Sequence, residues 1–171
     1  TNFKGEKLSP KIVVFESDDW GSLRTPKASI DPLLHRFGID KNKNPYLLYD
    51  HPASASDVSA LFDLLKLHKD ALENSPVITA NVNVANPDFE FIKKSNFEQY
   101  RAESMLQTFG RIFSETQNPI SVWKQGISEG LFYPQFHGRE HLWVNAWLET
   151  LQNREPLFLE AFELGFWGIT P

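Results

Sequence analysis

The sequence contains no cysteine, so its chemistry has to rest on other side chains. Disulfide bridges, thiolate metal ligands and a cysteine nucleophile are all excluded. The absence does not identify a cellular compartment, because many secreted proteins also lack cysteine. Localisation therefore stays open between a secreted and a cytoplasmic protein.

Long apolar runs and clusters of positive charge are missing as well. No stretch approaches the roughly 18 consecutive apolar residues that suggest a membrane-spanning helix, so we expect no membrane span. The formal net charge is -5, from 17 basic and 22 acidic residues. This acidic net charge, without a run of basic residues, predicts no positively charged surface for nucleic acid. Nucleic-acid partners are therefore disfavoured.

The composition instead suits a globular domain with a sizeable core. Of the 171 residues, 41% are hydrophobic and 13% are aromatic. The chain carries no internal repeat of fixed period and no low-complexity linker. We therefore expect a single domain over residues 1–171.

Three segments have the composition of strands. Residues 11–15 (KIVVF) form a β-branched and aromatic run that leads into polar residues, the pattern of a buried strand ending in a loop. Residues 77–84 predict a second strand, closed by an Asn-Pro pair. Residues 131–136 predict a third, in which Pro134 indicates an edge or a bulge.

Helices are expected between and after these strands. Ser54 is a suitable N-cap for a helix that reaches Glu73. Residues 20–52 form a long, proline-containing excursion with one or two helical turns near 30–37. Further helices are predicted at 98–113, at 118–130, at 139–152 and at 158–164, the last ending at Gly165, before a strand-like start at 167–169.

Strands that alternate with helices favour an α/β fold with a parallel sheet. In such folds, polar functional residues lie where strands end and helices begin. Asp18, Asp19 and His137 all fall at such positions. These residues are therefore the first candidates for a functional site.

His137 and His141 are four residues apart, a spacing that can bring two imidazoles to one metal ion. Taken alone, this spacing also fits two surface histidines at a helix start. Asp18 and Asp19 alone likewise fit a turn or a helix cap. The combination is more specific, because a strand-end Asp and two His residues make the three-ligand set of catalytic zinc sites.

The adjacent carboxylates can then divide two tasks between them. One carboxylate can bind the cation, while the other takes a proton from the attacking water as general base. The residues alone do not say which aspartate has which task.

The segments Phe15–Gly21 (FESDDWG) and His137–His141 (HGREH) resemble the polysaccharide deacetylase family of carbohydrate esterases. That family has an Asp-Asp-Gly motif after its first strand and a later His-(Ser/Thr)-x-x-His motif. The resemblance implies a distorted or partial (β/α) barrel, usually of seven strands. It also implies a metal-dependent hydrolase that removes acetyl groups from a poly- or oligosaccharide.

By resemblance, Asp18 matches the catalytic base, and Asp19, His137 and His141 match the metal ligands. The implied cofactor is a divalent metal, with Zn²⁺ the first candidate and other divalent transition metals as alternatives. The implied partner is a carbohydrate substrate. The sugar, and deacetylation at nitrogen or at oxygen, stay open.

The sequence departs from the family pattern at both motifs. Trp20 separates the acidic pair from Gly21, and Gly138 replaces the Ser or Thr that helps to hold the second histidine in the family. The interval between the motifs is also longer than usual. The loop geometry at the site is therefore expected to differ.

The family's later motifs are not visible after His141. These are an Arg-Pro segment, an Asp-Trp segment and a strand-borne His that serves as general acid. We therefore expect the chain to be incomplete at its C-terminus relative to such a barrel. The sheet would then have an unpaired edge, which favours a homo-oligomer formed through that edge.

Other residues are weaker candidates for the substrate cleft. Asn81 and Asn83 alternate on one face of the second strand and could project toward a sugar. Trp20 is the best of the aromatic residues for stacking on a sugar face, ahead of Tyr133 and Trp143. His35, His51 and His68 have no partner at ligand spacing and are interpreted as ordinary surface or packing histidines.

Two alternatives to a deacetylase remain. The first is a carbohydrate-binding or degenerate deacetylase-like domain without activity, which would explain the missing late motifs. The second is a zinc metallopeptidase, because residues 137–141 also satisfy the inverted pattern His-x-x-Glu-His, with Glu140 as general base. Gly138 weakens the helix that this pattern needs, and the peptidase leaves Asp18 and Asp19 unexplained.

Overall fold

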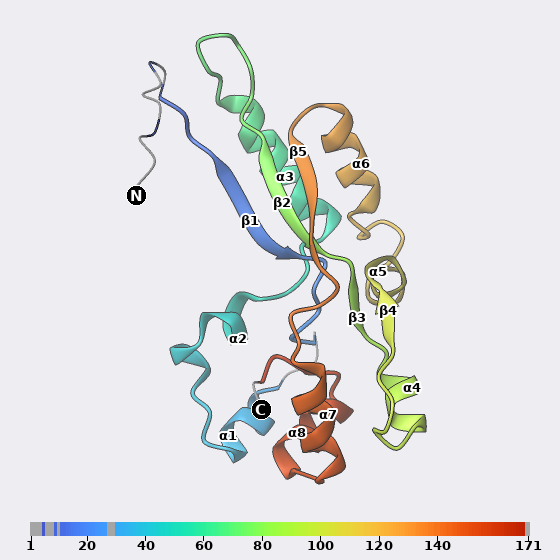
Figure 1. The fold of residues 1–171 in the computed structure, drawn as a ribbon. Coiled ribbons are helices and arrows are strands. Elements are labelled where there is room, and N and C mark those ends of the chain that lie inside the picture. The colour runs from blue at the N-terminus through green and yellow to red at the C-terminus, as the bar shows by residue number, and fades with distance from the viewer. Residues whose placement is uncertain (1–4, 6–8, 10, 27–29, 170–171) are drawn as a thin grey trace.

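A computed structural model of the chain describes residues 5, 9, 11–26 and 30–169. At its centre, three strands form a parallel sheet: β1 (Phe15–Trp20), β2 (Ile78–Asn83) and β5 (Phe132–Gly138). β2 lies between β1 and β5. Because the strands run in one direction, their carboxyl ends meet at the same end of the sheet, near the middle of Figure 1.

The side chains of β2 alternate between a packed and an open face of the sheet. Ala80 and Val82 are buried in the core under the helices. On the opposite face, Thr79 lies in register with Tyr133 of β5, whose side chain is 60% exposed. The face of the sheet away from the helices is therefore accessible to solvent at the level of Thr79 and Tyr133.

Three helices cover the packed face: α3 (Ala55–Leu67), α5 (Met105–Ile112) and α6 (Ile120–Ser128). α3 and α5 begin at capping boxes, in which Ser54 pairs with Asp57 and Ser104 with Gln107. The core of this layer consists of Val58, Phe62, Leu65, Ala80, Val82, Phe109, Phe113, Trp123, Leu131 and Phe132.

A second layer lies beyond the carboxyl ends of the strands (Figure 1). It contains α7 (Val144–Gln152) and α8 (Pro156–Glu163), which pack on α4 (Phe89–Lys94). Next to α4, β3 (Ala85–Pro87) pairs antiparallel with β4 (Ala102–Ser104). The core of this layer consists of Ile92, Phe97, Trp147, Leu151, Phe162 and Trp167.

The excursion after β1 also lies beyond the carboxyl ends of the strands. It contains α1 (Asp31–Arg36), the short 3-10 helix η1 (Lys41–Lys43) and α2 (Pro45–Tyr49). α1 packs against α8 through a third cluster, formed by Ile30, Leu33, Leu34, Ala161 and Phe166. The excursion and the last part of the described chain therefore lie together, below the sheet in Figure 1.

The strand predicted at 11–15 is wrong in position and in burial, since β1 begins only at the end of that run. Ile12, Val13 and Val14 are 64%, 73% and 68% exposed. The pairing with β2 starts at the first residue of each strand, so the residues ahead of β1 have no neighbour there. A β-branched run indicates strand propensity, whereas burial requires a partner that the run cannot specify.

Several helix limits also differ from the sequence-based expectation. The helix predicted at 139–152 begins at Val144, and the one predicted at 98–113 begins at Met105, after β4. α3 ends at Leu67 instead of Glu73, and α4 was not predicted. Residues 167–169 form no strand. The errors lie mostly at polar element ends, where hydrophobic spacing carries little information.

Four elements confirm the prediction, whereas β3, β4, η1 and α2 were not predicted as separate elements. β2, β5, α6 and α8 lie within two residues of the ranges expected from the sequence. Pro134 lies on the outer strand β5, as expected for a proline within a sheet. The α/β class with a parallel sheet is therefore confirmed, although the described residues form no closed barrel. Among them, no helix is both long and apolar enough to cross a membrane.

Candidate metal centre

A β-bulge at the end of β1 positions the two aspartates. Ser17 pairs with Ala80 and Trp20 with Val82, so Asp18 and Asp19 together face a single residue of β2. Bulges bend a strand and redirect its side chains, and they are common beside active sites. Asp19 adopts a left-handed backbone with a φ of 65°, which Asp tolerates better than most residues.

A second bulge lies at the end of β5. Val82 pairs with Phe136 and Asn83 with Gly138, so His137 has no partner on β2. The two outer strands are thus both irregular at the same level of the sheet. His137 comes from the bulge of β5, and His141 comes from the loop between β5 and α7.

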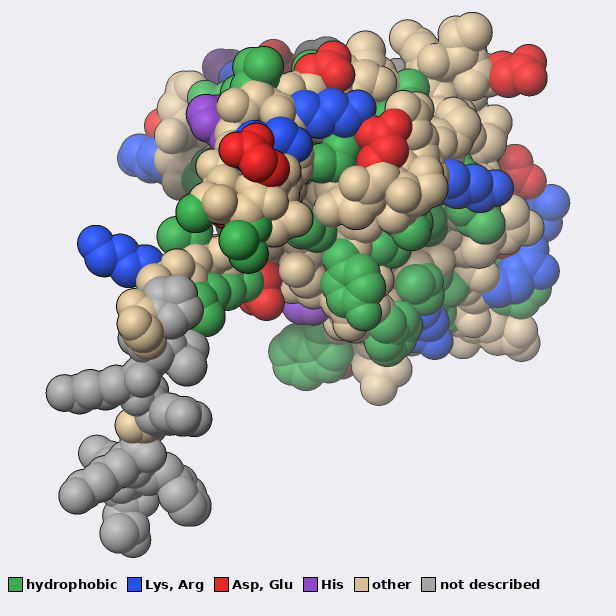
Figure 2. All heavy atoms as spheres, turned by 90° about the horizontal axis from the view of Figure 1, so that it is seen from above, with side chains coloured by type: hydrophobic (Ala, Val, Ile, Leu, Met, Phe, Trp, Pro, Cys, Tyr) green, Lys and Arg blue, Asp and Glu red, His purple; other side chains and the backbone are tan. Residues whose placement is uncertain are grey.

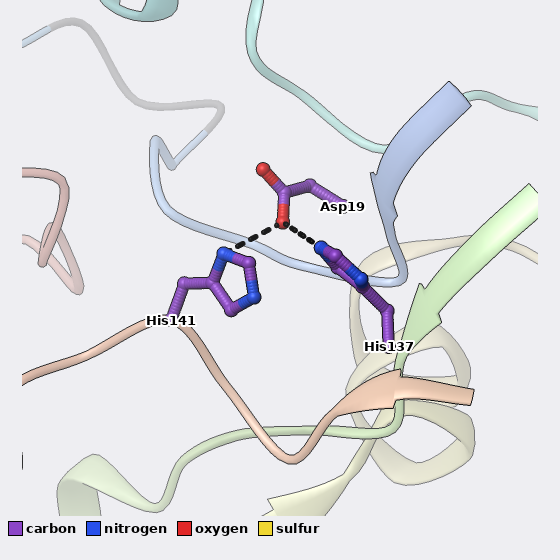
Figure 3. A group of neighbouring side chains, drawn as sticks. All are labelled: Asp19, His137 and His141. Atoms are coloured by element: carbon purple, nitrogen blue, oxygen red, sulfur yellow. Dashed lines mark ion pairs between the residues drawn. The ribbon is translucent and has the colours of Figure 1, made fainter. Parts of the chain in front are cut away.

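The side chains of Asp19, His137 and His141 converge on one point (Figure 3). Asp19 Oδ1 lies 3.1 Å from His141 Nδ1 and 3.9 Å from His137 Nε2. One ligand atom from each residue lies within 4.8 Å of the other two. The three residues predicted as metal ligands are therefore brought together, although they come from opposite parts of the chain.

These donor atoms fit a divalent cation. Two atoms that each lie about 2.1 Å from one ion can be no more than about 4.2 Å apart. Both distances from Asp19 Oδ1 satisfy that limit. One carboxylate and two imidazoles are also the donor types that zinc and other divalent transition metals prefer. The group could therefore hold one such ion.

Asn83 supports Asp19 from the end of β2. Its side chain is completely buried. Nδ2 donates hydrogen bonds to Asp19 Oδ1 at 2.8 Å and to Ser22 Oγ at 2.9 Å. Oδ1 of Asn83 faces Gly138, where an added Cβ would lie 3.5 Å from it. The space beside Gly138 would therefore hold a small side chain, but its φ of 158° is a backbone conformation that residues with a Cβ rarely adopt.

Asn81 has the corresponding role for the other aspartate. Its Nδ2 donates a hydrogen bond of 2.7 Å to Asp18 Oδ1. Asp18 is exposed, whereas Asp19 is partly buried. The amides predicted to face a sugar thus bind the two aspartates, and they orient the two carboxylates separately.

Arg24 and Asp50 are two site residues that the sequence did not indicate. Arg24 Nη2 pairs with Asp19 Oδ2, and Arg24 Nε lies 3.5 Å from Asp50 Oδ2. Both residues belong to the excursion after β1, where no spacing rule marks them. The hydrophobic spacing of α1 and α2 alone could not reveal which loop side chains turn back toward the strands.

The surroundings shift the pKa values of these carboxyl groups in opposite directions. Burial alone would raise the pKa of Asp19, but Asn83, Arg24 and His141 outweigh it and lower this pKa below its ordinary value. Burial raises the pKa of Asp50, the neighbouring Asp19 adds to this effect, and Arg24 opposes it. Asp19 is therefore stabilised as the carboxylate, the form that binds a cation.

A pocket of about 210 Å³ opens beside the acidic pair. Asp18, Asp19 and Trp20 form one wall, and residues 49–53 of the excursion, which include His51, form another. The volume suits a small group, since it lies below the range of roughly 300–1,000 Å³ that is typical of sites for drug-sized ligands. His51, interpreted from the sequence as an ordinary histidine, thus lies next to the candidate site.

The aromatic candidates differ in exposure. Trp20 packs edge-to-face on Trp123 and Phe132, with ring centroids 5.7 and 5.1 Å apart. Its ring belongs to the core layer, although it contributes to the pocket wall. Tyr133 and Trp143 are 60% and 71% exposed. Tyr133 and Trp143 therefore offer more exposed ring surface for stacking on a sugar than Trp20 does.

Comparison with known proteins assigns no family to the chain, because no family model, curated protein or solved structure matches it.

Proposed function

We propose that the protein is a metal-dependent hydrolase of the polysaccharide deacetylase type, which removes acetyl groups from a poly- or oligosaccharide. The observation that supports this most is the convergence of Asp19, His137 and His141, with Asp18 adjacent in the chain. Two sequence motifs from distant parts of the chain thus supply one donor set. Chance surface histidines would have no reason to face a strand-end aspartate.

In the proposed reaction, Asp19, His137 and His141 hold the cation. When bound, a divalent cation polarises an acyl carbonyl and lowers the pKa of water. Asp18 acts as general base, takes the proton of the attacking water, and returns it to the leaving nitrogen or oxygen of the sugar as the acyl C–N or C–O bond breaks. Its hydrogen bond from Asn81 fixes one carboxylate oxygen and leaves the other for the proton. The small pocket beside Asp18 is a suitable place for the acyl group.

The proposal includes the fold. We propose that β1, β2 and β5 correspond to neighbouring strands of a distorted or partial (β/α) barrel. Their parallel order and the position of the site at the carboxyl ends support this, since (β/α) barrels carry their sites at that end.

The inverted-motif peptidase receives less support. Glu140, its general base, makes three hydrogen bonds with the guanidinium of Arg139, and its side chain is only 3% exposed. The five residues of the motif lie in β5 and the following loop, not on a helix. Glu140 is therefore neither free nor placed on the helix face that such a peptidase requires.

The experiment measures zinc binding and acetate release by the 171-residue protein. The protein is stripped with a chelator, reloaded with Zn²⁺ and incubated with N-acetylated chito-oligosaccharides or with O-acetylated xylo-oligosaccharides. We expect zinc-dependent release from one of the two substrates. His137→Ala and His141→Ala should each weaken zinc binding by about tenfold or more, because each removes one of three protein ligands.

His68→Ala is the matched control, since His68 is the C-cap of α3 and belongs to no ligand group. It should leave zinc binding and acetate release unchanged. Equal zinc affinity in all four proteins would refute the metal centre. Zinc binding without acetate release from either substrate would favour the inactive, carbohydrate-binding alternative.

A further inference from the structure

Among the described residues of the excursion after β1, Arg24 forms an ion pair with a residue of the candidate metal centre. Arg24 Nη2 pairs with Oδ2 of Asp19, the carboxylate oxygen that does not face the histidines. The other oxygen, Oδ1, lies toward His137 and His141. The two oxygens of Asp19 therefore have separate partners: Oδ2 has the guanidinium of Arg24, and Oδ1 has the two imidazoles and the amide of Asn83.

Arg24 is itself held from several directions. Its Nε lies 3.5 Å from Asp50 Oδ2, and its guanidinium lies over the rings of Tyr46 and Trp167 at 5.7 and 5.9 Å. Its backbone carbonyl accepts a hydrogen bond of 3.1 Å from Trp167 N–H. The side chains of Arg24 and Asp50 are only 16% and 20% exposed. A guanidinium held in this way has little freedom to leave Asp19.

We infer that Arg24, oriented by Asp50, is a positioning residue that makes Asp19 a ligand through one oxygen only. The inference rests on the proposed metal centre. A carboxylate that is free to rotate can offer both oxygens to a cation, whereas an arginine on Oδ2 reserves Oδ1 for the ion. Hydrogen-bond partners behind metal ligands typically change metal affinity or activity by about 10- to 100-fold.

This arrangement gives the long excursion a role at the site. In this arrangement, Arg24 and Asp50 of the excursion hold the side chain of Asp19, which strand β1 alone would leave free to turn. Tyr46 of α2 and Trp167 beyond α8 pack on Arg24, so the excursion and the last part of the described chain both contribute. We therefore expect the excursion to influence the geometry of the bound ion as well as the stability of the fold.

The test is a Co²⁺ titration of the full chain, followed by calorimetry and by the visible spectrum of the ion, which reports coordination geometry. Arg24→Gln should weaken Co²⁺ binding by about tenfold or more and change the spectrum, because Asp19 can then offer its second oxygen. Arg24→Lys keeps a cationic donor and should recover part of the loss. Asp50→Asn should weaken binding in the same direction by a smaller factor.

Arg36→Gln is the matched control, because Arg36 also forms an ion pair from the excursion, with Glu160, but away from Asp19. It should bind Co²⁺ like the unaltered protein. Unchanged affinity and spectrum in Arg24→Gln would overturn the inference while the metal centre stands. Failure of the unaltered protein to bind Co²⁺ would instead refute the proposed function. If Arg24→Gln does not fold, unchanged binding in Asp50→Asn overturns the inference.

Discussion

Adjacent carboxylates in this protein have different environments. Asp19 is partly buried and contacts Asn83, Arg24 and His141, whereas Asp18 is exposed and accepts a hydrogen bond from Asn81. The bulge at the end of β1 produces this difference between neighbours. In the proposed function, this difference lets one aspartate serve as ligand and the other as base.

We predict that the same substitution has different effects at the two positions. Asp18→Asn should lower acetate release by about a hundredfold or more, because it removes the general base, and it should leave metal affinity nearly intact. Asp19→Asn should lose both metal and activity. Measuring metal content and acetate release side by side checks the pair. Equal metal loss in the two variants would show that the aspartates share one role.

The sequence predicted the converging ligands but not the residues that support them. The choice of Asp19 over Asp18 came from the resemblance to a family motif, but the acidic pair and the two histidines were recognisable because their spacing and strand-end positions suit metal binding. Arg24 and Asp50 were not, because they reach the site through the tertiary packing of a loop. The face on which Asn81 lies was predictable from strand alternation, but its bond to Asp18 depends on the bulge.

At the scale of elements, the site could be predicted only as far as strand side chains alternate regularly between the two faces of the sheet. A regular strand would send Asp18 and Asp19 to opposite faces of the sheet. The bulges in β1 and β5 interrupt this alternation at the level of the site. No residue pattern in the sequence predicts them, whereas the cap at Ser54 and the spacing of apolar residues correctly located the start of α3.

The contact between α3 and α6 depends on a glycine. A Cβ added to Gly126 of α6 would lie 2.3 Å from the ring of Phe62 on α3. Both residues border the core layer, and Phe62 is only 3% exposed. Phe62 therefore packs directly on the backbone of α6, and neither partner has room to move away.

We predict opposite effects for two glycine-to-alanine substitutions in helices. Gly126→Ala should lower the free energy of unfolding by about 1–3 kcal/mol, the usual cost of overpacking a core. Gly110→Ala is the control, because an added Cβ in α5 meets nothing within 4 Å. It should raise the free energy of unfolding by about 0.5–1 kcal/mol through the better helix propensity of alanine. Urea unfolding followed by circular dichroism measures both, and a stabilised Gly126→Ala would contradict the packing argument.

At the scale of the whole molecule, an exposed apolar run lies at the start of β1, beside an edge of the sheet. Ile12, Val13, Val14 and Phe15 are all at least 48% exposed. Seen from above in Figure 2, hydrophobic side chains lie exposed beside the N-terminal segment. Among the described residues, β1 and β5 each pair on one side only. Exposed apolar edges of this kind favour association with another chain.

We predict concentration-dependent self-association through this edge. Val13→Lys should reduce the association, because a charge directly ahead of an edge strand opposes pairing of that edge with a second copy. Ile127→Lys, which places the same charge on α6 at a side chain that is 47% exposed, is the control. Sedimentation velocity over a series of protein concentrations measures the effect. Identical association of the two variants would exclude the β1 edge as the contact.

The distance in sequence between Asp19 and His137 has a consequence for the kinetics of folding. The proposed ligands meet only after β1 and β5 have both joined β2, because each outer strand is hydrogen-bonded to β2 and not to the other outer strand. Closing so long a stretch of chain is a late and slow event in folding. A cation at the site would therefore find its ligands assembled only in the nearly native chain. It would slow unfolding and leave the rate of folding almost unchanged.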